Sequence, residues 1–224
     1  MNKVNLIEAT PWDTATLGMP TWQLTEYSEL ALQQARNTVG HHTLKVDPLA
    51  DKRLLHQYGF YYCGTLIEPH CDNSRLRVIT HPDATISKEI DVKLVLSICH
   101  GAFEDGRFHR DFNVPKAAAD LRYDKWLKQL LDERKVYGLY WQGSLAGFIA
   151  HNDNCLVLHA LARKYRGKGW SKYWWGAVCV DLLKSESYEI KSSVHASNLA
   201  IINLYASLGF YFKNPLDVYH CLIK

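Results

Sequence analysis

The chain has 224 residues, which is enough for one large domain or two small ones. Hydrophobic residues make up 47% and charged residues 22% of the sequence, a balance that excludes a disordered or collagen-like chain. The net charge of +3 is too small for the extended basic surface of a nucleic-acid-binding protein.

The spacing of the cysteines and the length of the apolar runs indicate in which cellular compartment the protein is expected. The six cysteines are scattered without a CxxC spacing, and the first residues lack the apolar core of a signal peptide. The apolar runs fall short of the roughly 18–20 residues that a membrane-spanning helix needs. These features predict reduced thiols and a cytoplasmic protein without a membrane span.

The first element that the periodicity predicts is a helix that begins at Pro48 and stops at Gly59, just before an aromatic strand. The same order recurs from Asn198 to the strand that follows Gly209. The order helix, glycine and strand is common in proteins. The recurrence also fits a weak internal repeat, in which the first part of the chain resembles the end of the second part. We therefore predict a truncated domain over residues 1–75 and a full domain over 76–224, with the polar run 70–75 as their boundary.

The second half alternates helices with strands. Strands are expected over residues 76–80, 136–141, 145–150, 155–162, 188–194 and 218–223, and helices over 85–103, 115–131, 169–183 and 198–208. A polar loop is expected over 104–114, and Gln142-Gly143-Ser144 is expected to join two strands as a hairpin. This order predicts a mixed α/β domain with a central sheet.

The densest basic feature lies between a buried strand and a helix. Its cations are Arg163, Lys164, Arg166, Lys168 and Lys172. The glycines at 167 and 169 let the backbone approach a bound group, and the first amides of the next helix attract phosphate oxygens. The spacing fits neither a Walker motif nor a GxGxxG fingerprint, which disfavours a nucleoside triphosphatase. The turn is a candidate polyphosphate site, and a solvated basic loop is the plain alternative.

Two motifs in this region resemble those of the GNAT superfamily of N-acetyltransferases. Arg166, Gly169 and Ser171 stand at the three positions of an Arg/Gln-x-x-Gly-x-Gly/Ala motif that holds the coenzyme A pyrophosphate, with serine as a departure. Residues 198–210 match the Asn-x-x-Ala, Leu-Tyr and Leu-Gly-Phe signature, with Ile201 where alanine is usual. The resemblance implies an α/β GNAT fold with a mixed, mostly antiparallel sheet, and acetyl-coenzyme A as co-substrate.

The resemblance also implies roles for individual residues. It places strands 155–162 and 188–194 on either side of the pantetheine arm, and makes Tyr205 the general acid for the departing thiolate. Packing is the alternative role for Tyr205, and Asn198 is expected to cap a helix, to touch the cofactor, or both. The implied cofactor-binding residues are Leu161, Ala162, Arg166, Gly167, Lys168, Gly169, Trp170, Ser171, Asn198 and Tyr205.

The acceptor amine must lose a proton, so transfer needs a base or a chain of waters within hydrogen-bond reach. His109, His159 and His195 are the candidates, because histidine titrates near neutral pH. The sequence favours none of the three, and it predicts no metal site.

Residues outside the cofactor motifs resemble the TDP-fucosamine acetyltransferase group of the superfamily. They form the runs 11–18, 106–111 and 123–126, with Leu17 where an aromatic residue is more usual. The resemblance implies a truncated GNAT-like domain ahead of a full one. It also implies an acceptor, the 4-amino group of a dTDP-4-amino-4,6-dideoxyhexose that serves as a precursor of surface polysaccharide. The expected substrate-binding residues are Trp12, Arg107, Phe108, His109 and Arg110, whose cations and rings suit a diphosphate and a base. The plain alternative is that residues 107–111 form an ordinary polar loop and Trp12 packs in the core.

Two other functions fit the same sequence. One is a GNAT enzyme for a different small amine, such as an amino acid or a polyamine. The other is a non-catalytic module that binds acyl-coenzyme A, against which the retention of Tyr205 argues. The sequence does not decide whether the protein forms a homodimer.

Overall fold

The computed structural model describes residues 5–184 and 188–224. Part of the chain start that was considered above, residues 1–4, lies outside the described residues. Among the residues described, no helix is both long enough and apolar enough to cross a membrane.

The chain divides into two compact units, each made of separate stretches. The first unit comprises residues 1–66, 104–122 and 215–224, and the second comprises 67–103 and 123–214. The first unit therefore takes in two stretches that the sequence assigned to the second half. The division of the chain at residue 75 into a truncated and a full GNAT domain stays a prediction.

The first unit contains a small sheet with the strand order β1-β2-β3-β11. Its strands are β1 (Ile7–Ala9), β2 (Thr21–Leu24), β3 (Gly40–Val46) and β11 (Tyr211–Ile223), and its short helices are α1 (Pro11–Leu17), α2 (Glu29–Arg36) and α3 (Arg53–Gln57). Strands β2 and β3 run parallel, whereas β11 is antiparallel to β3. Helix α2 begins after Ser28, whose hydroxyl accepts a hydrogen bond from the Ala31 amide, and it buries Ala31, Leu32 and Ala35 in the core of this unit.

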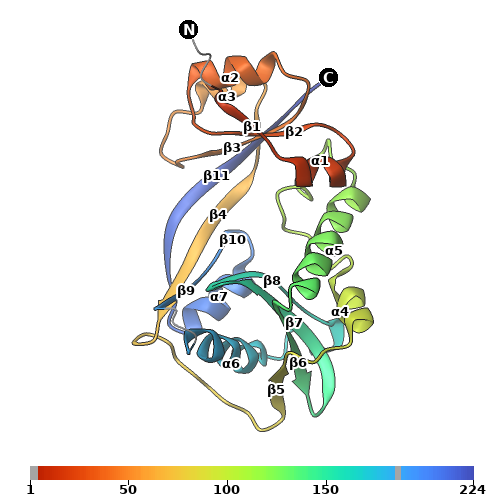
Figure 1. Cartoon of the computed structure of the whole chain (residues 1–224). Helices are drawn as coiled ribbons and strands as arrows, with labels where there is room; N and C mark the ends of the chain where they lie inside the picture. Colours follow the sequence, from red (N-terminus) through yellow and green to blue (C-terminus); the bar gives the residue numbers. More distant parts are fainter. Residues whose placement is uncertain (1–4, 185–187) are drawn as a thin grey trace. The chain divides into compact units, whose positions relative to one another are not determined.

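The second unit contains the larger part of the sheet, in the order β4-β9-β8-β7-β6-β5, with β10 paired to β4 (Figure 1). Its strands are β4 (Tyr61–Asp72), β5 (Ala84–Ser87), β6 (Val136–Trp141), β7 (Ser144–Asn152), β8 (Cys155–Leu161), β9 (Glu189–Ser192) and β10 (Val194–His195). Its helices are α4 (Val92–Cys99), α5 (Lys116–Asp132), α6 (Ser171–Leu183) and α7 (Leu199–Ser207). Strands β4 and β11 and helix α5 each run from one unit into the other.

Most elements of the second half follow the sequence prediction. The predicted hairpin is present between β6 and β7, where Gln142 and Gly143 have φ of 47° and 75°. Two consecutive positive φ values characterise a two-residue turn of type I′, which matches the twist of the flanking strands. The α/β fold with a mixed, mostly antiparallel sheet is confirmed.

Two predictions in the second half are wrong. Residues 76–80 form no strand, and the predicted helix over 85–103 is shorter, because β5 occupies residues 84–87 and α4 begins only at Val92. The helix starts there because the Asp91 carboxylate accepts hydrogen bonds from the amides of Lys93 and Leu94, at 2.9 and 3.1 Å. Strand β11 also begins earlier than predicted, at Tyr211 instead of residue 218.

Candidate active site

Strands β8 and β9 are paired at one end and separate at the other. Their parallel pairing joins Cys155 to Lys191 and Leu156 to Ser192, where β9 ends. The Ser192 hydroxyl donates a hydrogen bond of 2.7 Å to the Leu156 carbonyl at this point. Strand β8 continues to Leu161 and keeps only its pairing with β7. The side of β8 that faces away from β7 therefore offers backbone N–H and C=O groups to an extended ligand.

Tyr205 lies on α7, close to the point where β8 and β9 separate. It is fully buried, and its hydroxyl is 3.4 Å from Nε2 of His159 on β8. Burial raises the pKa of Tyr205 well above its usual value of 10, which a hydrogen bond with Ser192 opposes. The phenol is therefore protonated at neutral pH, and it suits a proton donor rather than a base.

Asn198 has the structural role that the sequence suggested. It is the N-cap of α7, and its side-chain oxygen accepts a hydrogen bond of 3.2 Å from the Ile201 amide. Its contact with the cofactor stays a prediction. At the other end of α7, Gly209 has a φ of +93°, and a Cβ there would lie 2.1 Å from the Arg75 carbonyl oxygen. The Leu-Gly-Phe signature therefore needs glycine at this position.

The three candidate bases have different surroundings. His159 packs edge-on against the ring of Trp175, and His195 lies beyond β9 with its Nδ1 2.7 Å from the Ser197 hydroxyl. His109 belongs to the first unit, where its Nε2 is 2.9 Å from the Asp120 carboxylate. Of the three, His159 is the candidate whose ring lies within hydrogen-bond distance of the Tyr205 hydroxyl.

Burial lowers the pKa of His159 to about 4, below the value of about 6.5 for an unfolded chain. Between these two values the unfolded chain binds the proton more tightly, so the free energy of unfolding falls as the pH is lowered from about 6.5 towards 4. At pH 5 we expect His159 to cost about 2 kcal/mol relative to neutral pH. Denaturant unfolding at pH 7 and pH 5 checks this value. The variant His159→Gln should lose less stability than the wild type over the same interval, and an equal loss would contradict the assignment.

The basic turn after β8 is open where a phosphate group would approach. Gly167 and Gly169 have φ of +72° and +70°, and a Cβ at either position would meet no atom within 4 Å. The Arg166 Nε donates a hydrogen bond of 2.7 Å to the Leu161 carbonyl, which ties the turn to the end of β8. Ala162 holds the same end through its amide, which donates to the Ala146 carbonyl.

Helix α6 follows this turn, with Trp170 at its N-cap position. Among the described residues no side chain caps the helix, and its first turn contains no acidic residue. Lys168 lies 4.6 Å over the ring of Trp170, which is stacked on Trp141 at 3.8 Å. Ser171 is the first helical residue, so its amide belongs to the positive end of the helix dipole. The predicted cofactor residues of the turn therefore surround an uncapped helix N-terminus, and they fit a pyrophosphate.

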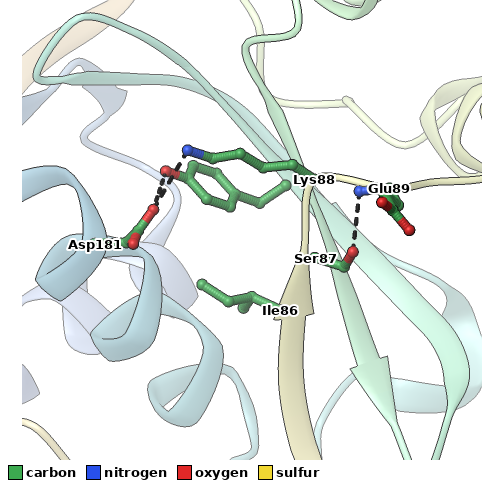
Figure 2. A pocket seen from close by; sticks show the side chains of 6 residues that line it. Ile86, Ser87, Lys88, Glu89 and Asp181 are labelled. Carbon is green, nitrogen blue, oxygen red and sulfur yellow. Dashed lines mark hydrogen bonds and ion pairs between the residues drawn. The ribbon is translucent and has the colours of Figure 1, made fainter.

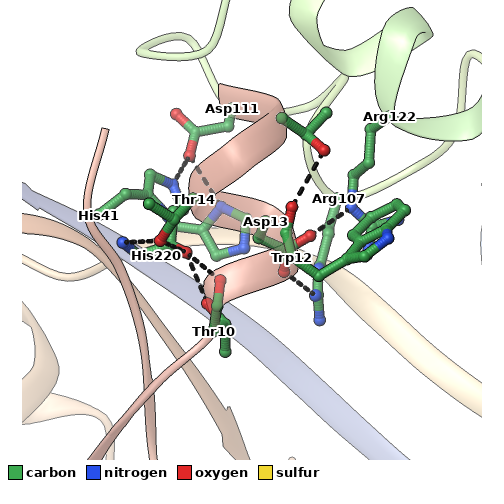
Figure 3. Close-up of polar contacts among 11 residues, drawn as sticks. Thr10, Trp12, Asp13, Thr14, His41, Arg107, Asp111, Arg122 and His220 are labelled. Carbon is green, nitrogen blue, oxygen red and sulfur yellow. Dashed lines mark hydrogen bonds and ion pairs between the residues drawn. The ribbon is translucent and has the colours of Figure 1, made fainter. Parts of the chain in front are cut away.

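The predicted substrate residues all lie in the first unit, where Asp13 pairs with Arg107 and with Arg122, a residue that was not predicted (Figure 3). The Arg122 Nε donates a hydrogen bond of 2.8 Å to Asp13, and Arg107 lies 3.8 Å from the same carboxylate. The guanidinium of Arg122 lies 5.0 Å from the ring centre of Trp12, which is 37% exposed. Sequence reasoning missed Asp13 and Arg122, because no spacing rule connects a residue of α1 with one of α5.

Three predicted substrate residues are already engaged within the first unit. Phe108 is 2% exposed and packs with Leu17, Val114 and Ala119. His109 bonds to Asp120, and Arg110 forms an ion pair of 3.2 Å with Asp105. Of the two predicted aromatic residues, Trp12 is the accessible one. The substrate roles of all five residues stay predictions.

The first unit also contains a buried cluster that the sequence did not reveal. Asp111 Oδ2 is 2.7 Å from both His41 Nε2 and His220 Nδ1, and all three side chains are buried (Figure 3). These three groups are close enough together for a metal ion to be considered. Because the residues are up to 179 positions apart in the sequence (220 − 41), only the folded chain brings them together.

A separate pocket of about 440 Å³ lies beside β5 and the end of α6 (Figure 2). Lys88 lies 3.5 Å from the Asp181 carboxylate, to which the Tyr137 hydroxyl donates a hydrogen bond of 2.8 Å. The lining residues that the structure describes include none of the predicted site residues. Lys88 and Asp181 are paired with each other, and we do not include this pocket in the candidate active site.

Residues 104–210 match the model of the acetyltransferase (GNAT) family, and no curated protein sequence matches the chain. Among solved structures, a GCN5-related N-acetyltransferase from Sphaerobacter thermophilus aligns with a TM-score of 0.67 at 12% identity, covering 97% of this chain and 76% of its own. A GNAT acetyltransferase from Colwellia psychrerythraea gives 0.55 at 14%, with coverages of 90% and 78%.

A tandem GNAT protein from the clavulanic acid biosynthesis pathway gives a TM-score of 0.56 at 13% identity, covering 92% of this chain and 76% of its own. At such identities the likeness shows the fold. Together with the match over residues 104–210, it supports an N-acetyltransferase enzyme with the GNAT fold.

Proposed function

We propose that the enzyme transfers an acetyl group from acetyl-coenzyme A to the amine of a nucleotide-linked amino sugar of the dTDP-4-amino-4,6-dideoxyhexose type. The transfer is direct and takes place while both substrates are bound. The observation that carries the transfer chemistry is the separation of β8 from β9 beside the buried phenol of Tyr205.

Each part of the cofactor site suits one part of acetyl-coenzyme A. The open glycine turn and the α6 N-terminus would hold the pyrophosphate, and the free side of β8 would hold the pantetheine arm by backbone hydrogen bonds. When bound, the thioester supplies an activated acetyl group. Tyr205 would give its proton to the departing sulfur, since its phenol is protonated at neutral pH.

The acceptor is inferred from the first unit and from the sequence resemblance. Arg107 and Arg122 share the single carboxylate of Asp13 beside the exposed ring of Trp12. Guanidinium groups suit a diphosphate because they present several donors in a fixed plane, and an exposed indole suits a nucleobase. These residues support a nucleotide-linked acceptor over a free polyamine, which would need acidic groups instead.

A substrate panel tests the proposal. The purified protein with acetyl-coenzyme A is offered dTDP- and UDP-linked amino sugars, a free amino sugar, an amino acid and a polyamine, and thiol release is followed. We expect release with the dTDP-linked 4-amino sugar above all others. Equal rates with a free amine would contradict the nucleotide-linked acceptor, and no release with any amine would favour a non-catalytic acyl-coenzyme A-binding module.

The variant Arg107→Ala should raise the KM for the dTDP-amino sugar about tenfold or more, since one charge-assisted contact to phosphate is lost. The KM for acetyl-coenzyme A should stay close to that of the wild type. Initial-rate kinetics with each substrate varied in turn check both values. Arg36→Ala, which removes an exposed arginine of α2, is the matched control. A parallel rise of both KM values would point to misfolding instead of a substrate contact.

A further inference from the structure

The Asp111 carboxylate is fully hydrogen-bonded within the first unit. Its Oδ2 accepts hydrogen bonds from His41 Nε2 and His220 Nδ1, both at 2.7 Å. Its Oδ1 accepts from the Tyr61 hydroxyl at 2.9 Å and from the Asn113 amide at 2.8 Å. His41 lies on β3 and His220 on the paired strand β11, so two strands hold the loop that carries Asp111.

These distances favour a hydrogen-bonded carboxylate over a metal centre. Two ligands of a tetrahedral zinc ion, each about 2.0–2.2 Å from the metal, lie more than about 3 Å apart, whereas both histidine nitrogens are 2.7 Å from one carboxylate oxygen. Burial lowers the pKa of His220 to about 4, so its ring is neutral at pH 7. Burial alone would raise the pKa of Asp111, but the hydrogen bonds from His220 and His41 hold it below its usual range.

The cluster contacts the predicted substrate residues through Phe108. The Phe108 ring centre lies 5.3 Å from that of His220 and 5.7 Å from that of His41. The guanidinium carbons of Arg107 and Arg122 lie 4.8 and 4.9 Å from the centre of the same ring. Phe108 therefore packs against the buried cluster and also against the two arginines that flank Asp13.

Stability alone is a weak explanation for this arrangement. A carboxylate that is removed from water has a large desolvation cost, and a well-packed apolar core is often at least as stable. In addition, His220 Nε2 is buried and has no hydrogen-bond partner in the described part of the chain. A buried polar network can instead specify one conformation, and the hydrogen bonds of Asp111 tie the 104–114 loop to strands β3 and β11.

We propose that His41, Asp111 and His220 are positioning residues that hold Phe108, and through it Arg107 and Arg122, in the geometry that binds the acceptor substrate. This inference rests on the proposed function, because it assigns the arginines to the nucleotide-linked acceptor. None of the three positioning residues touches the substrate in this account.

Amide substitutions test the proposal, because each histidine uses a different ring nitrogen. Gln places its amide nitrogen about where His Nε2 lies, and Asn about where Nδ1 lies. His41→Gln and His220→Asn should therefore keep the hydrogen bond to Asp111, whereas His41→Asn and His220→Gln should lose it. For the second pair we expect the KM for the dTDP-amino sugar to rise about tenfold, with the KM for acetyl-coenzyme A unchanged and the first pair close to the wild type.

Hydrogen exchange of the 104–114 amides provides a readout that needs no substrate. Faster exchange in His41→Asn and His220→Gln than in His41→Gln and His220→Asn would support the positioning role. This holds even if the substrate panel finds no nucleotide-linked acceptor, because that panel result would refute only the proposed function. The inference would be overturned if all four variants lowered the melting temperature equally, and if the two pairs of variants did not differ in hydrogen exchange or in KM. So would one equivalent of zinc in the purified wild-type protein, measured by elemental analysis.

Discussion

Tyr205→Phe is expected to lower turnover by about 10²–10⁴-fold, the range that a general acid contributes. The substitution keeps the aromatic ring and removes the hydroxyl that lies 3.4 Å from His159 Nε2. Ring packing against Phe210, at 4.7 Å between ring centres, should survive. Steady-state rates at saturating acetyl-coenzyme A measure the effect, and calorimetry should show nearly unchanged cofactor affinity.

Tyr137→Phe is the matched control for this variant. Tyr137 is also a buried tyrosine of the second unit, but its hydroxyl donates to Asp181 beside the separate pocket. Its loss should leave turnover within about threefold of the wild type. Burial raises the pKa of Tyr205, so the wild-type rate should not fall as the pH rises towards 10. A drop of less than about threefold in Tyr205→Phe, with chemistry rate-limiting, would make Tyr205 a packing residue.

Gly169→Asp is expected to weaken the binding of acetyl-coenzyme A by roughly tenfold or more. The glycine has a φ of +70° and faces open space at the start of α6. An aspartate there would place a negative charge where the pyrophosphate is expected, against the positive end of the helix. Titration calorimetry with acetyl-coenzyme A measures the change in affinity.

Two further variants separate charge from backbone strain. Gly169→Asn adds a side chain of nearly the same size without the charge, and asparagine tolerates positive φ better than most residues. Gly143→Asp places the same carboxylate in the hairpin turn, where φ is +75° and a Cβ also meets no atom within 4 Å. We expect Gly169→Asn to lose less affinity for acetyl-coenzyme A than Gly169→Asp, and Gly143→Asp to lose none. Equal affinity in all three would remove the turn from the cofactor site.

The sequence signals for the cofactor half of the site are local, whereas those for the first unit are not. The glycine turn, the Asn198 cap and Tyr205 lie within a short stretch of chain, where spacing rules and family motifs apply directly. The prediction of a helix over 85–103 failed because apolar residues at 86 and 90 fit a helical period, although Ile86 is in fact paired to Leu139 in the sheet.

The contacts in the first unit could not be predicted from local patterns. Asp111 meets His41 and His220, and Arg122 meets Asp13, only because strands and helices from distant parts of the chain are adjacent in the folded unit. Pattern rules also gave no reason for Phe108 to be buried. An aromatic residue in a polar loop is expected to be exposed. The burial of Phe108 depends on packing partners such as Leu17, which is distant in the sequence.

Strands β4 and β11 limit how far the protein can be divided. Residues 70–72 of β4 pair with β9 of the second unit, and residues 217–223 of β11 pair with β3 of the first. Cutting the chain at residue 75 would thus remove β11 from the first fragment and β4 from the second. The backbone groups of β3 would be exposed in the first fragment and those of β9 in the second. The two units consequently depend on one uninterrupted polypeptide, and neither is an interchangeable module that could be transplanted alone into another enzyme.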